Sequence, residues 1–397
     1  MELTSALKEF IHEHQGDDTD RLLLAAARFP EIDVPFAAMQ IASRRQVKGK
    51  LPSWYANDAL VFPTKIAAEQ CSSEVTARYK QRLAGNALHI CDLTGGLGID
   101  SCAFAEKAKS VTYIERFQDY CSAARHNFPL LGYANINIVE GDGTKLYAGI
   151  PSVDVFYIDP ARRGEGNKRI FALQDCEPDL QALLPSLLDV APKVIAKLSP
   201  MADIRQTLSL LPGTAAIHIV AVKNEVKELL FEIKAACAPE KQTAIHCYNY
   251  ISEGKEECFS FNLEDEREAE AALAEDVQTY LYEPNAAILK AGAFKTLCRL
   301  TINKLHTSSH LYTSDNPIGD FPGRTFIVSE VFPFNGKLMK TLSKTIPQAN
   351  ISIRNFPLGA KELQKRTGIR DGGDIYLFAT TLKNNEKAII CCRKKPQ

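Results

Sequence analysis

Between Leu88 and Ile233 the chain alternates short apolar runs with segments of helical periodicity, and this order constrains the fold more than any other feature. Such alternation is typical of parallel strands joined by crossover helices. The last two runs are separated only by a turn, so the last strand must run antiparallel to its predecessor. We therefore expect a Rossmann-like α/β domain with a seven-stranded sheet, whose strands are Leu88–Leu93, Ser110–Ile114, Ile136–Val139, Val153–Ile158, Val194–Lys197, Ala216–Val222 and Leu229–Lys234.

A glycine-rich turn follows the first of these strands. The segment His89–Asp100, HICDLTGGLGID, runs from the strand through Gly95, Gly96 and Gly98 into a helical pattern. Glycine lets the backbone turn sharply and approach a ligand closely, and the next helix points its free N–H groups at the same place. The turn predicts a nucleotide or nucleoside site, although similar turns also occur only to pack a helix on a sheet.

Acidic residues end the first four predicted strands, at the edge where open α/β sheets bind ligands. After Asp92, Glu115 ends the second strand and is placed to accept from both ribose hydroxyls of a cofactor. Asp142 follows the third strand and is placed to accept from an adenine amino group, and Asp159 follows the fourth. A dinucleotide site would also need a G-x-G-x-x-G run. Ser101 stands at the last position of that run, which favours S-adenosylmethionine over NAD.

The motifs DLTGGLGID, YIER, EGDG and FYIDPARRG together resemble class I S-adenosylmethionine-dependent methyltransferases. DPARR resembles the DPPY and DPPR motifs of nucleic-acid methyltransferases. Over nearly its whole length, the chain is similar to bacterial methyltransferases with a THUMP-like C-terminal domain. The resemblance implies that Asp159 to Arg162 face the methyl acceptor. It also implies that S-adenosylmethionine is held by Asp92, Gly96, Gly98, Glu115 and Asp142. Thr94 is a further candidate cofactor contact, although it stands where many small-molecule methyltransferases have their first glycine, a departure that RNA and DNA enzymes often share.

The DPARR segment is the candidate catalytic loop. Methyl transfer from a sulfonium is an in-line displacement, so alignment of the acceptor accounts for most of the catalysis. A base nitrogen whose lone pair is delocalised needs an acceptor for its N–H, which Asp159 or the carbonyls around Pro160 can provide. Arg162 and Arg163 are candidates to hold a phosphate or a guanine edge. In the alternative interpretation, Asp159 caps a following helix and the arginines are solvated.

The end of the fifth predicted strand helps to discriminate among acceptors. Methylation of uracil C5 needs a cysteine nucleophile, conventionally at this position, because the carbon is not nucleophilic unaided. Ser199 stands there instead, so a ring nitrogen or an exocyclic amine is the favoured acceptor. Lys197 is a further candidate contact to the acceptor, although a lysine at a strand end is often only solvated.

Positive charge is concentrated in the last third of the chain. Residues 284–397 contain 18 Lys and Arg against 7 Asp and Glu, whereas residues 1–283 contain 29 against 41. A basic module of this kind can neutralise RNA phosphates without reading sequence, so we expect a structured rRNA or tRNA as the partner. The candidate contacts are Lys340, Lys365 and Arg366, within two clusters formed by Lys337, Lys340 and Lys344 and by Lys361, Lys365, Arg366 and Arg370.

Two other functions fit the same residues. In one, the protein methylates a protein or a small molecule, and the basic module serves only solubility. In the other, the chain binds RNA without catalysis. The complete acidic series argues against the second alternative, while the net charge of residues 284–397 argues against the first.

Three domains are expected from the changes of pattern along the chain. Residues 1–80 form a helical domain, 81–238 the methyltransferase domain, and 239–397 a basic α+β domain. The last domain is expected to begin with a strand pair and two helices, namely Ala244–Ile251, Glu257–Leu263, Glu264–Tyr280 and Asn285–Cys298. Within the first, Thr64–Leu83 is expected to be one long helix. Trp54 is expected to pack between the helical domain and the sheet, with a lid or base-stacking role as the alternative.

The remaining composition excludes several classes. The eleven cysteines are scattered in apolar runs and form no CxxC pair or Cys/His cluster, so we expect reduced thiols and no metal site. No apolar run approaches the length of a membrane span, and the N-terminus lacks a signal-peptide pattern. We therefore expect a cytoplasmic protein of open oligomeric state.

Overall fold

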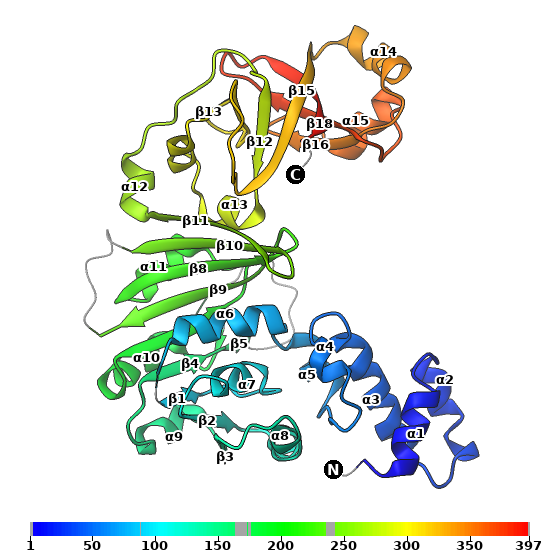
Figure 1. Ribbon diagram of the computed structural model, residues 1–397, viewed down its shortest axis with the longest axis vertical. Coiled ribbons are helices and arrows are strands. Elements are labelled where there is room, and N and C mark those ends of the chain that lie inside the picture. The colour runs from blue at the N-terminus through cyan, green and yellow to red at the C-terminus, as the bar shows by residue number, and fades with distance from the viewer. Residues whose placement is uncertain (1–2, 88, 163–172, 174–175, 236–242, 396–397) are drawn as a thin grey trace. The chain divides into compact units, whose positions relative to one another are not determined.

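The computed structural model describes residues 3–87, 89–162, 173, 176–235 and 243–395 (Figure 1). The chain divides into two compact units. The first comprises Met1–Ala215 and Leu230–Cys237, and the second Ala216–Leu229 and Ala238–Gln397. Among the described residues, no helix is both long and apolar enough to cross a bilayer.

The described residues form a sheet of nine strands, in the order β11-β10-β8-β9-β7-β4-β1-β2-β3. β1 pairs in parallel with β2 and β4, β2 with β3, and β4 with β7, as the crossover pattern predicts. The strands of this sheet are β1 His89–Asp92, β2 Ser110–Glu115, β3 Ile136–Glu140, β4 Val155–Ile158, β7 Lys193–Leu198, β8 Thr214–Val222, β9 Glu225–Lys234, β10 Ala244–Ser252 and β11 Lys255–Asn262.

The prediction of seven strands is wrong, because β10 and β11 join the same sheet. β10 pairs in parallel with β8, from Ala244 opposite Ala216 to Tyr250 opposite Val222, and β11 pairs antiparallel with β10. An unpaired β8 would leave a row of backbone donors and acceptors open at a sheet edge, and the added strands satisfy them. Lys223 and Asn224, both at positive φ, connect β8 and β9, as the tight turn of a hairpin requires.

Helices of the first unit pack on this sheet through a shared apolar core. Ala84 of α6 and Phe104 of α7 contact a cluster that contains Ile90, Val111 and Ile195 of the strands. Figure 1 shows α6 and α7 beside β1 and β4. The other elements here are α8 Gln118–Leu130, α9 Gly143–Leu146, η2 Tyr147–Gly149, α10 Leu180–Val190, α11 Ile204–Leu210 and a short hairpin of β5 Ala161–Arg162 with β6 Cys176–Glu177; α7 spans Ile99–Ala105.

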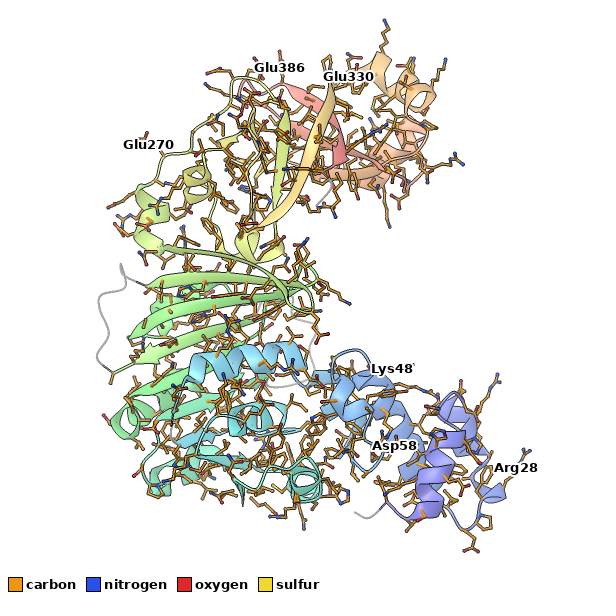
Figure 2. All side chains as sticks on the ribbon, in the orientation of Figure 1. Arg28, Lys48, Asp58, Glu270, Glu330 and Glu386 are labelled. Atoms are coloured by element: carbon orange, nitrogen blue, oxygen red, sulfur yellow. The ribbon has the colours of Figure 1, made fainter. Side chains whose placement is uncertain are left out.

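All elements between residues 3 and 84 are helices, and the long helix expected over Thr64–Leu83 is two helices. Thr64 caps α5 and Ser73 caps α6, each by accepting from a backbone N–H three residues on, which favours separate helix starts. Asp58 and Lys48, labelled in Figure 2, lie near α4, where Asp58 pairs with Arg44 at 3.3 Å. The helices are α1 Ser5–Glu13, α2 Thr19–Leu24, η1 Ala26–Arg28, α3 Val34–Val47, α4 Pro52–Tyr55, α5 Lys65–Gln70 and α6 Glu74–Ala84.

Trp54 packs in the core that joins these helices to the glycine turn. Its side chain is 4% exposed and lies in one cluster with Phe62, Leu97 and Phe128. Both the N–H and the C=O of Val61 bond to the side-chain amide of Asn127 on α8, at 2.9 and 2.7 Å. The packing interpretation of Trp54 is confirmed, and its role as a lid or base-stacking residue is wrong.

The second unit contains a further sheet, in the order β13-β14-β12-β15-β18-β17-β16. α14 and α15 cover one face of it, since Leu342 and Leu363 share a core with Leu377 and Ile389. Glu330, labelled in Figure 2, lies at an irregularity of the β15–β18 pairing. The elements are α12 Leu263–Glu268, β12 Tyr280–Pro284, α13 Ala286–Ala291, η5 Thr296–Leu300, β13 Asn303–Lys304, β14 Tyr312–Ser314, β15 Gly323–Pro333, α14 Gly336–Thr345, β16 Asn350–Arg354, α15 Ala360–Thr367, β17 Ile375–Thr381 and β18 Lys387–Lys394.

Candidate cofactor and acceptor site

A cleft of about 580 Å³ lies in the first unit, at the carboxyl ends of β1, β2, β3 and β4. Open α/β sheets bind ligands at this edge, and the volume suits a nucleoside-sized ligand. Gln70 at the end of α5, and Cys71 and Ser72 in the break between α5 and α6, also line it. The cleft brings together predicted site residues from four separate segments: Asp92, Thr94, Gly96, Gly98, Glu115, Asp142 and Asp159.

The glycines of the turn have two different roles. A Cβ on Gly95 would lie 2.2 Å from the ring of Tyr113, and one on Gly98 would lie 2.5 Å from the ring of Phe128. These two glycines therefore allow aromatic side chains to pack beneath the turn. Gly96 has a φ of +55°, and a Cβ there would have only the carbonyl oxygen of Thr94 near it, at 3.7 Å, so its backbone is the part that a ligand can approach.

Glu115 binds the turn directly. One carboxylate oxygen accepts from the N–H of Gly96 and the other from the N–H of Phe117, both at 2.9 Å. The side chain is buried, yet each oxygen keeps a second acceptor position for a hydroxyl. Phe117, whose ring is 52% exposed, also lines the cleft, and sequence reasoning missed it. An exposed aromatic residue directly after Glu115 is the signal that marks it.

Asp142 caps α9 beside the turn. Its Oδ1 accepts from the N–H and the hydroxyl of Thr144, at 3.0 and 2.7 Å. The hydrogen bond from the Thr144 hydroxyl is the largest cause that lowers the pKa of Asp142. A Cβ on the following Gly143 would lie 2.4 Å from the carbonyl oxygen of Leu93, so the absence of a side chain allows the two loops to approach. An ionised acceptor is thereby fixed on this wall of the cleft.

Asp92 lines the cleft, but almost all of its side chain is buried. It is 1% exposed, and its oxygens accept from the N–H of Thr94 at 3.1 Å and from the hydroxyl of Ser101 at 2.6 Å. Burial raises the pKa of Asp92 to about 7. Asp92 thus fixes the geometry of the turn, and its direct contact with a cofactor stays a prediction.

A buried ion pair below the turn was missed by sequence reasoning. Lys80 of α6 is fully buried, and its ammonium lies 3.0 Å from a carboxylate oxygen of Asp100. The other oxygen of Asp100 accepts from Ser72 and Tyr157, both at 2.8 Å. The available signal is Asp100 itself, because a charge among the apolar residues of α7 needs a buried partner. Within the described ranges, no group of three or more His, Cys, Asp or Glu residues is placed to hold a metal.

Asp159 is constrained at both its main chain and its side chain. Its N–H donates to the hydroxyl oxygen of Thr94 at 2.8 Å, and its carboxylate lies 2.5 Å from the ammonium of Lys197. Strand β5 follows it, so the alternative in which Asp159 caps a following helix is wrong. Pro160 is buried behind Asp159. Arg163 and the side chain of Arg162 lie outside the described residues.

The basic residues predicted to contact RNA belong to the second unit, whereas the cleft belongs to the first. Lys340 on α14 and Lys365 and Arg366 on α15 are exposed. Arg366 forms an ion pair with Glu362 one turn earlier, at 2.5 Å. The structure thus places the two predicted clusters on adjacent helices of the second unit, α14 and α15.

Two family models match the second unit. Residues 280–322 match a ferredoxin-like domain, and residues 323–394 match a model described as THUMP domain-like. The boundary between the two matches falls at the start of β15.

Among curated proteins, the chain is 29% identical over 119 residues to the uncharacterized RNA methyltransferase BH0687 of Halalkalibacterium halodurans. It is 38% identical over 77 residues to the uncharacterized RNA methyltransferase MMOB5020 of Mycoplasma mobile. The matches cover 27% and 19% of this chain, and the chain spans only 26% and 21% of the length of those relatives.

Among solved structures, the chain matches a candidate methyltransferase from Porphyromonas gingivalis W83 with a TM-score of 0.90 and 39% identity. The match covers 98% of each chain, so the similarity includes both units. The resemblance inferred from the motifs is therefore confirmed, and the chain belongs to a bacterial family of class I methyltransferases with a THUMP-like C-terminal domain.

Proposed function

We propose that the protein transfers a methyl group from S-adenosylmethionine to a base of structured RNA, an rRNA or a tRNA. One observation carries the cofactor assignment. The glycine turn, Glu115 and Asp142 end neighbouring strands and line one cleft that also contains Asp159. This arrangement suits a nucleoside with a charged amino-acid arm, and Ser101 stands where a diphosphate-binding G-x-G-x-x-G run has its last glycine.

Each wall of the cleft has a separate task in this proposal. Glu115 accepts from the ribose hydroxyls with the acceptor positions that Gly96 and Phe117 leave open. Asp142 accepts from the adenine amino group. The bound cofactor supplies an activated methyl group on a sulfonium. Asp159 accepts a hydrogen bond from the N–H of a ring nitrogen or exocyclic amine, which directs the nitrogen lone pair at the methyl group. As the new carbon–nitrogen bond forms, the carbon–sulfur bond breaks, the neutral thioether leaves, and the proton of the nitrogen passes by way of Asp159 to water.

Lys197 contributes through Asp159. The ammonium of Lys197 lies 2.5 Å from one carboxylate oxygen and holds the Asp159 side chain in one orientation. The second carboxylate oxygen can then accept a hydrogen bond from the base that is methylated. The ion pair lies at the edge of the cleft, with Lys197 15% exposed and Asp159 36% exposed. This favours an indirect role for Lys197 over the direct contact with the acceptor that the sequence suggests.

The exposed cations of α14 and α15 support RNA as the substrate. Leu342 and Leu363 pack the two helices into one core, so the lysines and arginines of both helices form one basic region. Such a region neutralises phosphates and fixes the orientation of an RNA without selecting a base. The names of the two curated relatives agree with RNA methylation.

Catalysis is tested with Asp159→Ala in the full-length protein. We expect unchanged affinity for S-adenosylmethionine by calorimetry and loss of methyl transfer to total RNA from cells that lack the gene. Asp189→Ala, an exposed carboxylate on α10, is the matched control and should be fully active. Full activity of Asp159→Ala would refute the catalytic assignment.

The RNA assignment is tested with a triple alanine variant of Lys340, Lys365 and Arg366. Each lost phosphate contact should lower the slope of log affinity against log salt by about 0.7–0.9. Alanine at the exposed Lys107 and Lys109 of the first unit is the control. Absence of RNA binding by the wild-type protein at low salt would favour a protein or small molecule as the acceptor.

A further inference from the structure

The side chain of Thr94 adds one more hydrogen bond between the chain segments that follow β1 and β4, after the backbone pairing of these strands has ended. The β1–β4 ladder ends where the N–H of Leu93 donates to the carbonyl of Tyr157, at 3.0 Å. The next bond is made by a side chain, because the N–H of Asp159 donates to the hydroxyl oxygen of Thr94 at 2.8 Å. A glycine at position 94 has no atom that can make this bond.

Thr94 is itself held by the glycine turn. Its N–H donates to Asp92 at 3.1 Å, and the other oxygen of Asp92 accepts from Ser101, which is fully buried on α7. A continuous series of hydrogen bonds therefore runs from α7 through the turn to Asp159. At its far end, Lys197 holds the carboxylate of Asp159. Asp159 is thus fixed at its main chain by Thr94 and at its side chain by Lys197.

We propose that Thr94 is a positioning residue, which sets the place of Asp159 relative to the glycine turn and so aligns the methyl acceptor with the cofactor. The proposal rests on the proposed function, in which Asp159 binds the acceptor. In this proposal, the Thr94 hydroxyl belongs to the turn that holds the cofactor but acts on the position of the methyl acceptor. Because in-line transfer is sensitive to displacements of about 1 Å, loss of this bond should affect the transfer step and not cofactor binding.

The test compares Thr94→Val with Thr94→Ser in the full-length protein. Valine keeps the branched shape but removes the acceptor, whereas serine keeps the hydroxyl. We expect Thr94→Val to lower the single-turnover rate of methyl transfer to RNA at saturating cofactor about 10- to 100-fold. Its dissociation constant for S-adenosylmethionine should stay within about twofold of the wild type, and Thr94→Ser should restore most of the rate.

Thr112→Val is the matched control. Thr112 is a buried threonine on β2, whose hydroxyl bonds to His89 at 2.8 Å, outside the cleft. This variant should keep the wild-type rate. If Thr94→Val weakens cofactor binding and leaves the saturated rate intact, Thr94 is a cofactor ligand and the proposal is wrong. If Thr94→Ser is as slow as Thr94→Val, the hydroxyl is not responsible and the proposal is also wrong.

Hydrogen exchange at the Asp159 amide separates this proposal from the proposed function, since it needs no RNA substrate. Thr94→Val should lose protection at this amide while binding the cofactor normally. Unchanged protection would refute the positioning contact even if transfer to RNA were observed. Conversely, Thr94→Val could lose protection at this amide although the wild-type protein methylates no RNA. That result would support the contact between Thr94 and Asp159 and would refute only the proposed RNA methylation.

Discussion

Lys80→Met is expected to destabilise the first unit by an amount that depends on pH. The fully buried ammonium of Lys80 lies 3.0 Å from Asp100 and donates to the hydroxyl of Ser72 at 2.8 Å. Methionine has a similar length and no charge, so the substitution removes the cation with little change of volume. It leaves a buried carboxylate with only hydroxyl donors and more distant charges.

The magnitude follows from breaking one side of a buried ion pair, which costs about 3–5 kcal/mol. At about 2–4 °C per kcal/mol for a unit of this size, the unfolding midpoint should fall by about 6–20 °C. Burial acts to raise the pKa of Asp100, but the cations of Lys80 and Lys197 outweigh it, so the pKa is lowered in the wild type. Without Lys80, that pKa should rise.

The sign of the pH dependence then reverses. In the wild type, Asp100 contributes stability above its unfolded pKa of about 3.8, and this is lost as the pH falls through the lowered folded value. In Lys80→Met, the raised folded pKa makes stability fall as the pH rises above about 4. The difference from the wild type should therefore be larger at pH 8 than at pH 5.

Denaturant unfolding at pH 5 and pH 8, followed by circular dichroism, measures this difference. Lys107→Met, at an exposed position, is the control. The double variant Lys80→Met with Asp100→Asn should recover much of the loss, because no buried charge remains. A loss below about 1 kcal/mol, or one equal at both pH values, would refute the reasoning.

Three further predictions concern the turn and the second unit. Asp92, with a folded pKa of about 7, should make the wild type less stable by about 3 kcal/mol as the pH rises from 4 to 7; Asp92→Asn should flatten this dependence in denaturant titrations. Gly95→Ala should displace Tyr113, lower the thermal midpoint and weaken cofactor binding measured by calorimetry, at a cost of about 1–3 kcal/mol or more. Glu283→Gln should cost about 3–5 kcal/mol in chemical unfolding, because the buried carboxylate binds two arginines. Wild-type behaviour in any of these measurements would contradict the corresponding contact.

Strands β4 and β7 of the first unit were predictable because they are mostly buried. Val155–Ile158 reads as a continuous apolar run and Val194–Ala196 forms the apolar centre of β7, so the observed ends match the expected ranges closely. β10 and β11 were predicted as strands, but their membership in the nine-stranded sheet was not. Nothing local in a strand indicates which edge it will join, since pairing is decided by long-range contacts.

Short elements of the second unit were not predictable from pattern. The acidic stretch Glu264–Tyr280, expected to be helical, is helical only to Glu268, because the following residues pair with other segments. The helix expected over Asn285–Cys298 is interrupted at Gly292, which adopts a φ of +76°. β13 and β14 are too short for periodicity to indicate a strand.

Some residues of the candidate site were predictable from the sequence, and their contacts with one another were not. The positions of Glu115 and Asp142 followed from strand order alone, because the carboxyl ends of parallel strands meet at one edge. The contacts of Thr94 with Asp159 and of Lys80 with Asp100 did not, since they depend on the register of β1 against β4 and on the helix that precedes β1. Periodicity gives the face of an element and not the atoms that meet there.

The bonds of Asn127 to Val61 have a consequence for how this protein tolerates shortening. A chain that begins at residue 81 would lack Trp54, Phe62 and Lys80, and would leave the Asn127 amide without both of its backbone partners. The apolar wall around Phe128 would become a surface that favours aggregation. The segment before the sheet is therefore part of the core of the first unit, and deletions from the N-terminal side should be tolerated only upstream of the residues that complete this wall.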